Sequence, residues 1–389
     1  MRILITGGRA PATLDLVRTL AQDAEAIFIA ESAPMTVASF SRYIERSFRV
    51  PPPRQDPKGF HHALREIIIK QGITHMIPTC EELFTVLEDE HWLRERICLF
   101  APPHDALLRL HSKWRFAEWM SSIGLEVPNT EQIVSRDKLA EHVTSHGKTH
   151  VYKPEWSRFG VKVRVGPESA DWVAGERCDE RYAWLAQERI IGEQWCTYSW
   201  LIEGQLTAHA CYPMAFSKGT QASLVFSHQD HPLIEAWVKR FGELTQLTGQ
   251  IAFDFIVRED KVFAIECNPR LTSGMHTLYR AELTQRLPLS PQRSSALPAS
   301  FTAPIYGKTE SQALKAALLI YAPIEAKTSG LGAWWRAMFL SQDVLLRWSD
   351  PLPGLLWPLG YLYFVWIAWR EGLSAVAAST FDIEWNSER

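Results

Sequence analysis

Apolar and polar residues alternate along the first hundred positions in a way that predicts strands and helices in turn. Ile3-Leu4-Ile5 is a short apolar run, and residues 14–20 place apolar side chains at helical spacing after a glycine turn. The succession continues with expected strands at 26–30, 74–78 and 97–100 and expected helices at 63–70 and 80–93. This alternation predicts a doubly wound parallel sheet over residues 1–105.

The pattern changes near residue 149, where short alternating runs predict strands joined by tight turns. Strands are expected at 151–154 and 185–191, hairpins at 197–202 with 205–211 and at 251–257 with 262–266, and helices at 107–124 and 232–247. A polar, proline-rich stretch over residues 287–304 marks a boundary. We therefore expect three domains, at 1–108, 109–300 and 301–389.

The last part of the chain is expected to be helical and is dense in tryptophan, since seven of the 16 tryptophans lie after residue 330. Its longest apolar run, 355–369, is interrupted by Pro358 and Gly360 and is shorter than the roughly 20 residues of a membrane-spanning helix. The pattern favours a helical pair that packs on the rest of the chain or forms a homodimer interface. Because tryptophan favours membrane interfaces, a lipid-facing or substrate-facing surface stays the alternative.

Composition narrows the class of protein. The 389 residues are 46% hydrophobic, which allows a sizeable core, and the net charge of -3 gives no basic field for a nucleic acid. The six cysteines form no C-x-x-C pair and have no zinc-ligand spacing, so free thiols are expected. The first residues reach glycine after three apolar positions, which is not the pattern of a signal peptide. We expect a cytoplasmic protein.

The strongest candidate for chemistry is the last hairpin. Asp254 lies on its first strand, and Glu266 and Asn268 end the second strand, two positions apart and therefore on one face. Two carboxylates and an amide oxygen are hard ligands of the kind that Mg²⁺ takes, with phosphate oxygens completing its shell. Arg270 follows after two more positions and adds a cationic fork suited to phosphate.

The neighbours of these four residues are apolar, which argues against an ordinary charged surface hairpin. Charges in apolar surroundings are costly unless they are paired or bind a metal. The apolar neighbours are Ile251, Phe253, Phe255, Val262, Phe263 and Ile265. We therefore interpret the hairpin as a metal and phosphate site.

Two further segments fit a nucleotide, although each is weak when taken alone. Lys153 ends an apolar strand and precedes Pro154 and a loop, where a lysine is suited to a phosphate. The segment 187–193 is expected to present a strand edge whose free backbone groups read an adenine and whose carboxylates hold a ribose. Solvated lysines and charged edge strands are the common alternatives.

Together and in this order, these segments resemble the ATP-grasp superfamily. The resemblance covers residues 1–285 and rests on a helical lysine, a Lys-Pro strand, an acidic stretch, an acidic strand and a Glu-x-Asn-Pro-Arg ending. The matching residues are Lys113, Lys153-Pro154, Glu188 to Glu193, Asp254, and Glu266-Cys267-Asn268-Pro269-Arg270. The ending is most similar to the branch that contains carbamoyl-phosphate synthetase large subunits and related amino-acid ligases. The resemblance implies an α/β plus α+β chain, with a pre-grasp doubly wound sheet, a grasp fold of two α+β subdomains, and a helical Trp-rich module outside the family pattern.

The resemblance also implies roles for these residues. The expected nucleotide contacts are Lys113, Lys153, Gln187, Glu188, Ile190 and Glu193, and the expected metal ligands are Asp254, Glu266 and Asn268. Arg270 would contact the transferred phosphate and act with Lys153 in catalysis. The implied cofactors are ATP and two Mg²⁺ ions, for which Mn²⁺ would substitute. The sequence departs from the family in the loop after Lys153-Pro154, which has Gly160 in place of a glycine-rich run.

The residues that would bind the other substrates are less defined. Glu81 and Glu82 follow the third expected strand and would bind a substrate amine, unless they are acidic residues that a helix N-terminus favours. Lys218 and Arg270 are the candidates for a substrate carboxylate.

The expected activity joins two small molecules, a carboxylate and an amine, through an acyl phosphate, with release of ADP and phosphate. Positioning and electrostatic stabilisation would supply the catalysis, so no nucleophilic side chain is required. A ligase with a thiol acceptor, a phosphotransferase, and a non-catalytic nucleotide-binding protein at the membrane periphery are the alternatives.

Overall fold

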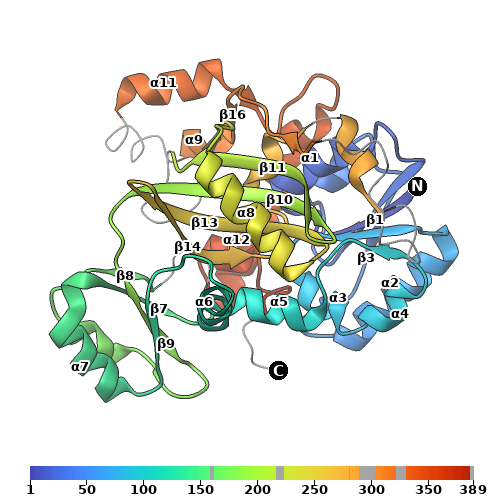
Figure 1. Cartoon of the computed structure of the whole chain (residues 1–389). Helices are drawn as coiled ribbons and strands as arrows, with labels where there is room; N and C mark the ends of the chain where they lie inside the picture. Colours follow the sequence, from blue (N-terminus) through green and yellow to red (C-terminus); the bar gives the residue numbers. More distant parts are fainter. Residues whose placement is uncertain (158–161, 216–222, 280, 289–302, 321–329, 386–389) are drawn as a thin grey trace.

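Five N-terminal strands form a parallel sheet in the order β3-β2-β1-β4-β5. The computed structural model describes residues 1–157, 162–215, 223–279, 281–288, 303–320 and 330–385 (Figure 1). The strands are β1 (Arg2–Thr6), β2 (Ala26–Glu31), β3 (Arg46–Arg49), β4 (His75–Pro78) and β5 (Cys98–Leu99). The order reverses between β1 and β4, and ligands of such sheets bind at the carboxyl ends of the strands there. The predicted doubly wound sheet is confirmed, and β3 is a strand that the sequence pattern missed.

Helices connect these strands and end at residues suited to those positions. They are α1 (Pro11–Leu20), α2 (Pro57–Gln71), α3 (Glu82–Leu87) and α4 (Glu90–Arg94), with the 3-10 helix η1 (Ala38–Phe40). Asp56 caps α2 by accepting a hydrogen bond from the backbone of Gly59, and Gly72 ends that helix at a φ of 59°. The single helix expected over residues 80–93 is instead two short helices, with Asp89 at the N-cap of the second.

Two further sheets follow along the chain. The small sheet has the order β6-β9-β7-β8, and the large sheet has the order β14-β13-β10-β11-β15. The small sheet contains β6 (Thr130–Ile133), β7 (His150–Pro154), β8 (Arg164–Val165) and β9 (Trp184–Glu188). The large sheet contains β10 (Glu193–Ile202), β11 (Gln205–Pro213), β13 (Gly249–Arg258), β14 (Lys261–Asn268) and β15 (Ile305–Tyr306). In Figure 1 the small sheet lies with α7 at one end of the molecule, and the first sheet lies at the other.

The helices of this part include α5 (His104–His111), α6 (Lys113–Ser122), α7 (Arg136–His146) and α8 (Pro232–Thr245), with the 3-10 helices η2 (Gly147–Thr149), η3 (Asp171–Gly175), η4 (Ser273–His276) and η5 (Ala281–Arg286). The one helix expected over residues 107–124 is divided at Ser112, whose backbone is extended. The Ser112 side chain accepts a hydrogen bond from the backbone of Arg115, so it caps α6. This division places Lys113 at the first position of α6.

The C-terminal part is less uniformly helical than its sequence predicts. It contains α9 (Lys315–Ile320), α11 (Leu331–Leu340), α12 (Leu352–Glu371) and α13 (Ala375–Ala378). It also contributes β15 to the large sheet, and its strands β16 (Gln312–Ala313) and β17 (Gln342–Asp343) form a three-stranded sheet with β12 (Val225–Phe226) in the order β12-β16-β17. Strands of two residues leave no periodic pattern in a sequence, which explains why the helical pattern of this part did not predict them.

One apolar core joins the first sheet, the large sheet and the C-terminal part. Ile5 of β1, Trp200 of β10 and Val344 are all fully buried in it. A second core lies between the large sheet and α8, where Phe253 packs against Trp237 at a ring distance of 4.9 Å. The strands that carry the candidate site are therefore held on a rigid, well-packed sheet.

A buried arginine fixes the C-terminal part to the first sheet. Arg18 of α1 is 1% exposed and donates hydrogen bonds to the carbonyl groups of Val344 and Leu345 at 2.7 and 2.9 Å. Its Nε lies 2.9 Å from the Asp350 carboxylate. Asp15, one turn earlier in α1, contacts His276 at 2.8 Å. These bonds satisfy a charge that would otherwise be costly to bury.

α12 is a single helix of 20 residues, longer than the apolar run at 355–369 that the sequence marked. A proline inside a helix removes one backbone hydrogen bond and favours a kink, yet α12 continues on both sides of Pro358. Gly360 serves close packing instead, since a Cβ there would lie 2.5 Å from the carbonyl oxygen of Met35. Among the described residues α12 is the one helix long and apolar enough to cross a membrane, a criterion that core helices of soluble proteins also meet.

Candidate active site

The hairpin of β13 and β14 places Asp254 directly opposite Glu266. The register then shifts, because Phe255 pairs with Ala264 and leaves Ile265 as an extra residue. Such a bulge turns the end of a strand and redirects its side chains. The two carboxylates therefore face each other at the irregular end of the sheet, as the sequence predicted from the positions of the paired strands.

The electrostatics of this carboxylate pair favour a bound cation. Burial, together with the facing Glu266 carboxylate, raises the pKa of Asp254. Burial alone would also raise the pKa of Glu266, but Lys113 and Lys153 hold it below its usual value. Two facing carboxylates repel each other unless a proton or a cation lies between them. The pair is therefore suited to a divalent metal.

Asn268 and Arg270 extend the same group of polar side chains. The Asn268 amide lies 3.5 Å from Glu266 Oε1, and Arg270 Nη2 donates to Asn268 Oδ1 at 3.4 Å. Two carboxylates and an amide oxygen fit Mg²⁺, which keeps waters and takes phosphate oxygens in its remaining positions. No group of three or more histidine, cysteine or acidic side chains in the described part of the chain is arranged to hold a metal, so the candidate ligands here are two carboxylates and an amide.

Both predicted lysines point to this carboxylate pair. Lys113 Nζ lies 3.8 Å from Glu266 Oε2 and donates to the Ser157 carbonyl group at 2.6 Å. Lys153 Nζ donates to the carbonyl group of Ile265, the bulge residue, at 3.1 Å. Burial, opposed by Glu266, lowers the pKa of Lys153 to about 8. A cation that is poorly solvated and close to a metal site is suited to a polyphosphate.

The expected nucleotide-reading segment differs from its prediction in one respect. β9 has a partner strand on each side, so Gln187 and Glu188 do not lie on a free strand edge. Gln187 donates to Thr130 Oγ1 at 3.1 Å, and the Glu188 backbone donates to the Asn129 carbonyl at 2.7 Å. The sequence could not predict this, because the pairing partner β6 lies more than fifty residues earlier.

The connection between the small and large sheets follows directly. Ile190 is buried, and Ile191 is 73% exposed. Gly192 packs against the end of β13 so closely that a Cβ would lie 2.1 Å from the Val257 carbonyl oxygen. Glu193, which begins β10, is exposed and accepts a hydrogen bond from the Trp195 indole at 3.3 Å. The strand expected at 185–191 thus ends at Glu188, and residues 189–192 form the connection to β10.

The two acidic residues after β4 have different surroundings. Glu81 is 3% exposed, and its Oε1 lies 3.8 Å from Arg270 Nη2. Glu82 Oε1 instead accepts hydrogen bonds from Thr6 at 2.6 Å and from the backbone of Thr79 at 3.0 Å, so it stabilises the turn after β4. Lys218, the other residue expected to bind a substrate, lies outside the described residues.

The loop after β7 is described as far as Ser157, so Gly160 lies outside the described residues. Glu155 accepts hydrogen bonds from Ser112, the cap of α6, and from Gln132 at 2.9 Å. This contact joins the start of the loop to the helix that carries Lys113. No local pattern singles out Glu155, because its two hydrogen-bond partners belong to other elements.

Comparison with known proteins identifies this part of the chain. Residues 110–274 match the family model of the ATP-grasp domain. No curated protein matches the sequence. The matched residues include the two lysines, the acidic strand and the Glu-x-Asn-Pro-Arg ending.

Solved structures share the fold at low sequence identity. An L-amino acid ligase from Bacillus licheniformis is 13% identical, with a TM-score of 0.56, over 72% of this chain and 70% of that chain. An ADP complex of an N5-carboxyaminoimidazole ribonucleotide synthetase is 15% identical, with a TM-score of 0.57, over 79% and 78%. A biotin carboxylase from Campylobacter jejuni, solved with an ATP ligand, is 16% identical, with a TM-score of 0.57, over 77% and 72%.

The matched domain and the shared fold agree with each other. Residues 110–274 therefore form an ATP-grasp domain, in agreement with the predicted resemblance. The predicted fold class is confirmed by the fold that the chain shares with the solved structures.

Proposed function

We propose that this ATP-grasp enzyme activates a small carboxylate substrate as an acyl phosphate and joins it to an amine. The products would be an amide, ADP and phosphate. The observation that carries the proposal is the meeting of Lys113 and Lys153 with the facing carboxylates of Asp254 and Glu266. A polyphosphate and its metal need both kinds of charge in one place.

Asp254, Glu266 and Asn268 would hold two Mg²⁺ ions, or Mn²⁺ in their place. When bound, the metal would neutralise phosphate oxygens and so favour attack on phosphorus. Lys113 and Lys153 would contact the phosphates from the opposite side. The backbone at Ile190 would read the adenine, with Gln187 and Glu188 ahead of it and Glu193 at the ribose.

The reaction has two steps. In the first, a carboxylate oxygen of the substrate attacks the γ-phosphorus of ATP, and the bond to the bridging β–γ oxygen breaks to release ADP. In the second, the amine nitrogen attacks the acyl carbon, loses a proton to solvent, and the phosphate leaves with both electrons of the C–O bond. Arg270 would stabilise the charge that develops on the transferred phosphate and on the acyl oxygen. Positioning supplies most of the remaining rate enhancement.

The thiols near the site are not candidates for a covalent intermediate. Burial raises the pKa of Cys196 and of Cys267, so both are protonated at neutral pH. All six cysteines are free. We propose that the enzyme works in the reducing cytoplasm on small-molecule substrates.

The test is product analysis with the purified full chain. A panel of carboxylic acids and amines is incubated with MgATP, and ADP, phosphate and new amide mass are measured together. We expect ADP and phosphate to appear in equal amounts with one amide, and only when both substrates are present. The Glu266→Ala variant serves as the inactive control.

Other products would contradict the proposal in distinct ways. AMP and pyrophosphate would exclude an acyl phosphate. A phosphorylated product without an amide would indicate a phosphotransferase, and a thioester would indicate a thiol acceptor.

A further inference from the structure

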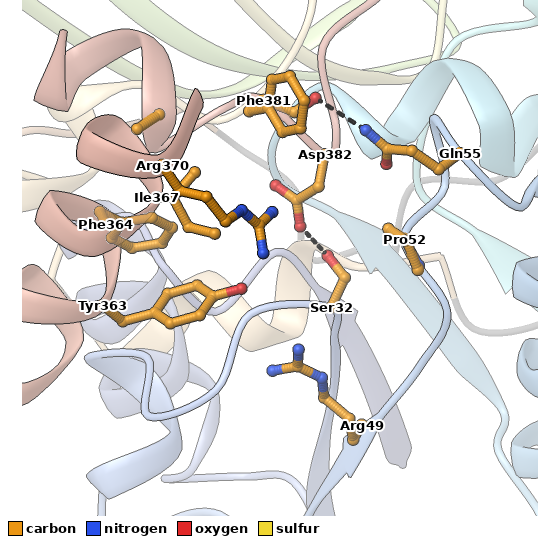
Figure 2. A pocket seen from close by; sticks show the side chains of 11 residues that line it. Ser32, Arg49, Pro52, Gln55, Tyr363, Phe364, Ile367, Arg370, Phe381 and Asp382 are labelled. Carbon is orange, nitrogen blue, oxygen red and sulfur yellow. Dashed lines mark hydrogen bonds between the residues drawn. The ribbon is translucent and has the colours of Figure 1, made fainter. Parts of the chain in front are cut away.

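The last described residues of the chain cross the carboxyl end of the first sheet. The Asp382 carboxylate lies between Arg9 and Ser32, 2.6 Å from Arg9 Nη1 and 2.5 Å from Ser32 Oγ. Figure 2 shows the bond between Asp382 and Ser32. It also shows the hydrogen bond from Gln55 to the carbonyl group of Phe381, at 3.4 Å. We call the segment 381–385 the strap. These bonds hold its first two residues, Phe381 and Asp382, against the end of the first sheet.

The second half of the strap is held by the loop after β3. The Arg54 backbone donates to the Asp382 carbonyl group at 3.0 Å, and the Arg54 side chain lies 3.2 Å from the Glu384 carboxylate. The side chain of Ile383 between them is 4% exposed. These contacts direct the strap toward the site.

Trp385 lies between the first sheet and the loop that follows Lys153. Its ring stacks on Phe84 at a centroid distance of 4.6 Å and an interplanar angle of 11°. It also meets the edge of Trp156, in the loop after β7, at 5.1 Å. The strap therefore bridges the pre-grasp sheet and the loop that follows Lys153.

The backbone of Trp385 donates a hydrogen bond to the carboxylate of Glu81, the residue that the sequence analysis proposed for a substrate amine. Its N–H donates to Glu81 Oε2 at 3.3 Å, while Glu81 Oε1 lies 3.8 Å from Arg270. Glu81 is only 3% exposed. A substrate ammonium group would need the oxygen that the strap now uses, and the substrate's carboxylate would find Arg270 beside it.

We propose that the strap competes with the amine substrate and that Trp385 imitates it. The Trp385 N–H takes the place of the substrate amine, and the indole takes the place of an apolar or aromatic side chain beside Phe84 and Trp156. The substrate class is then an amino acid with a large apolar side chain. This inference rests on the proposed ligase activity and names one of its substrates.

The kinetic test compares Trp385→Ala with Trp385→Phe and with Trp369→Ala. Trp369 is a matched control, because it is an indole of the same C-terminal part that is 81% exposed. Loosening the strap raises the fraction of enzyme open to the amine, so Trp385→Ala should lower the KM for apolar amino acids about three- to tenfold. The KM for ATP should stay within about twofold, because the contacts of Trp385 described above go to Glu81, Phe84 and Trp156 and not to Lys113 or Lys153.

Trp385→Phe and Trp369→Ala are the comparison variants for Trp385→Ala. Trp385→Phe, which keeps an aromatic ring, should return the KM for the amino acid toward the wild-type value, and Trp369→Ala should leave it unchanged. An unchanged or raised KM for the amino acid in Trp385→Ala would overturn competition by the strap.

A second measurement is independent of ligase activity. Hydrogen–deuterium exchange of the peptide that contains residues 381–385 should be faster in Trp385→Ala and Glu81→Gln than in the wild type and in Trp369→Ala. Equal exchange in all four proteins would overturn the strap itself. If no amide forms with any substrate pair while the strap exchanges as expected, the failure lies with the proposed function.

Discussion

The hairpin of β13 and β14 and the helix α12 are opposite in character. On the hairpin, charged side chains lie among buried rings. Glu266 has Lys113 and Asn268 as neighbours, and Arg270 donates to Asn268. On α12, apolar side chains face solvent, and 16 of the 23 exposed large apolar side chains of the described residues lie between residues 319 and 369. A charge in apolar surroundings demands a specific partner and so points to chemistry. An apolar surface exposed to water is stabilised by any apolar partner that buries it, so it does not identify that partner.

The two regions also differ in what holds them in place. The hairpin belongs to a continuous sheet, where β13 is paired with β10 and β14 along most of its length. The C-terminal part depends more on Arg18 and the bonds that it makes to residues 344, 345 and 350. Changes on the hairpin should therefore affect activity, and changes in the C-terminal part outside the strap should affect stability or nothing.

The largest expected effect is the loss of activity in Glu266→Ala. Removal of this carboxylate takes away a proposed metal ligand and the partner of Lys113, so ADP formation should fall by about 10²- to 10³-fold or more. Circular dichroism should show an unchanged fold. Asp260→Ala, in the exposed turn of the same hairpin, is the control and should keep full activity. Normal ADP formation in Glu266→Ala would remove the hairpin from the active site.

The next effect is on folding, in Arg18→Ala. This change leaves the buried Asp350 carboxylate without its partner and should lower the free energy of unfolding by about 3–5 kcal/mol. Denaturant unfolding followed by fluorescence measures it. Arg240→Ala, at an exposed position of α8, should cost less than about 0.5 kcal/mol. Equal stability of the two variants would mean that the C-terminal part does not depend on Arg18.

A smaller effect is the dependence of nucleotide affinity on pH. Because burial lowers the pKa of Lys153 to about 8, its positive charge is present below pH 8 and is lost as the pH rises through that value. The Kd for MgADP should therefore rise by up to about tenfold between pH 7 and pH 9. Lys153→Arg keeps its charge over this range and should show a flatter profile. A wild-type profile as flat as that of the arginine variant would exclude a role for the Lys153 charge in binding.

The smallest effect is expected for Trp348→Ser. Trp348 is 95% exposed, so its replacement should change the free energy of unfolding by no more than about 0.5 kcal/mol and should leave ADP formation unchanged. Trp200→Ser is the contrasting variant, because Trp200 is fully buried in the core. A large loss of stability in Trp348→Ser would mean that the apolar surface is covered in solution.

The comparison also explains which features the sequence could predict. Asp254, Glu266 and Asn268 were predicted as ligands because the period of a strand fixes which residues share a face. Lys153 was predicted from its place at the end of an apolar strand, and Lys113 from the resemblance to the ATP-grasp family. Periodicity relates residues that are close together in the sequence, and the prediction of these site residues required little beyond such local information.

The features that were missed depend on contacts between distant residues. The contact of Trp385 with Glu81 joins positions 304 residues apart, and that of Arg18 with Asp350 joins positions 332 apart. The partner strands of β9 and the continuity of α12 through Pro358 likewise depend on packing against other elements. Local spacing carries no information about such pairs.

The central claim is that Asp254, Glu266 and Asn268 hold the metal that accompanies the nucleotide. Titration calorimetry of ADP with and without Mg²⁺ tests it most directly, in the wild type and in Glu266→Gln, which keeps the size of the side chain and removes its charge. We predict that Mg²⁺ tightens ADP binding about tenfold or more in the wild type and has little effect in Glu266→Gln. An equal gain from Mg²⁺ in both proteins would contradict the account.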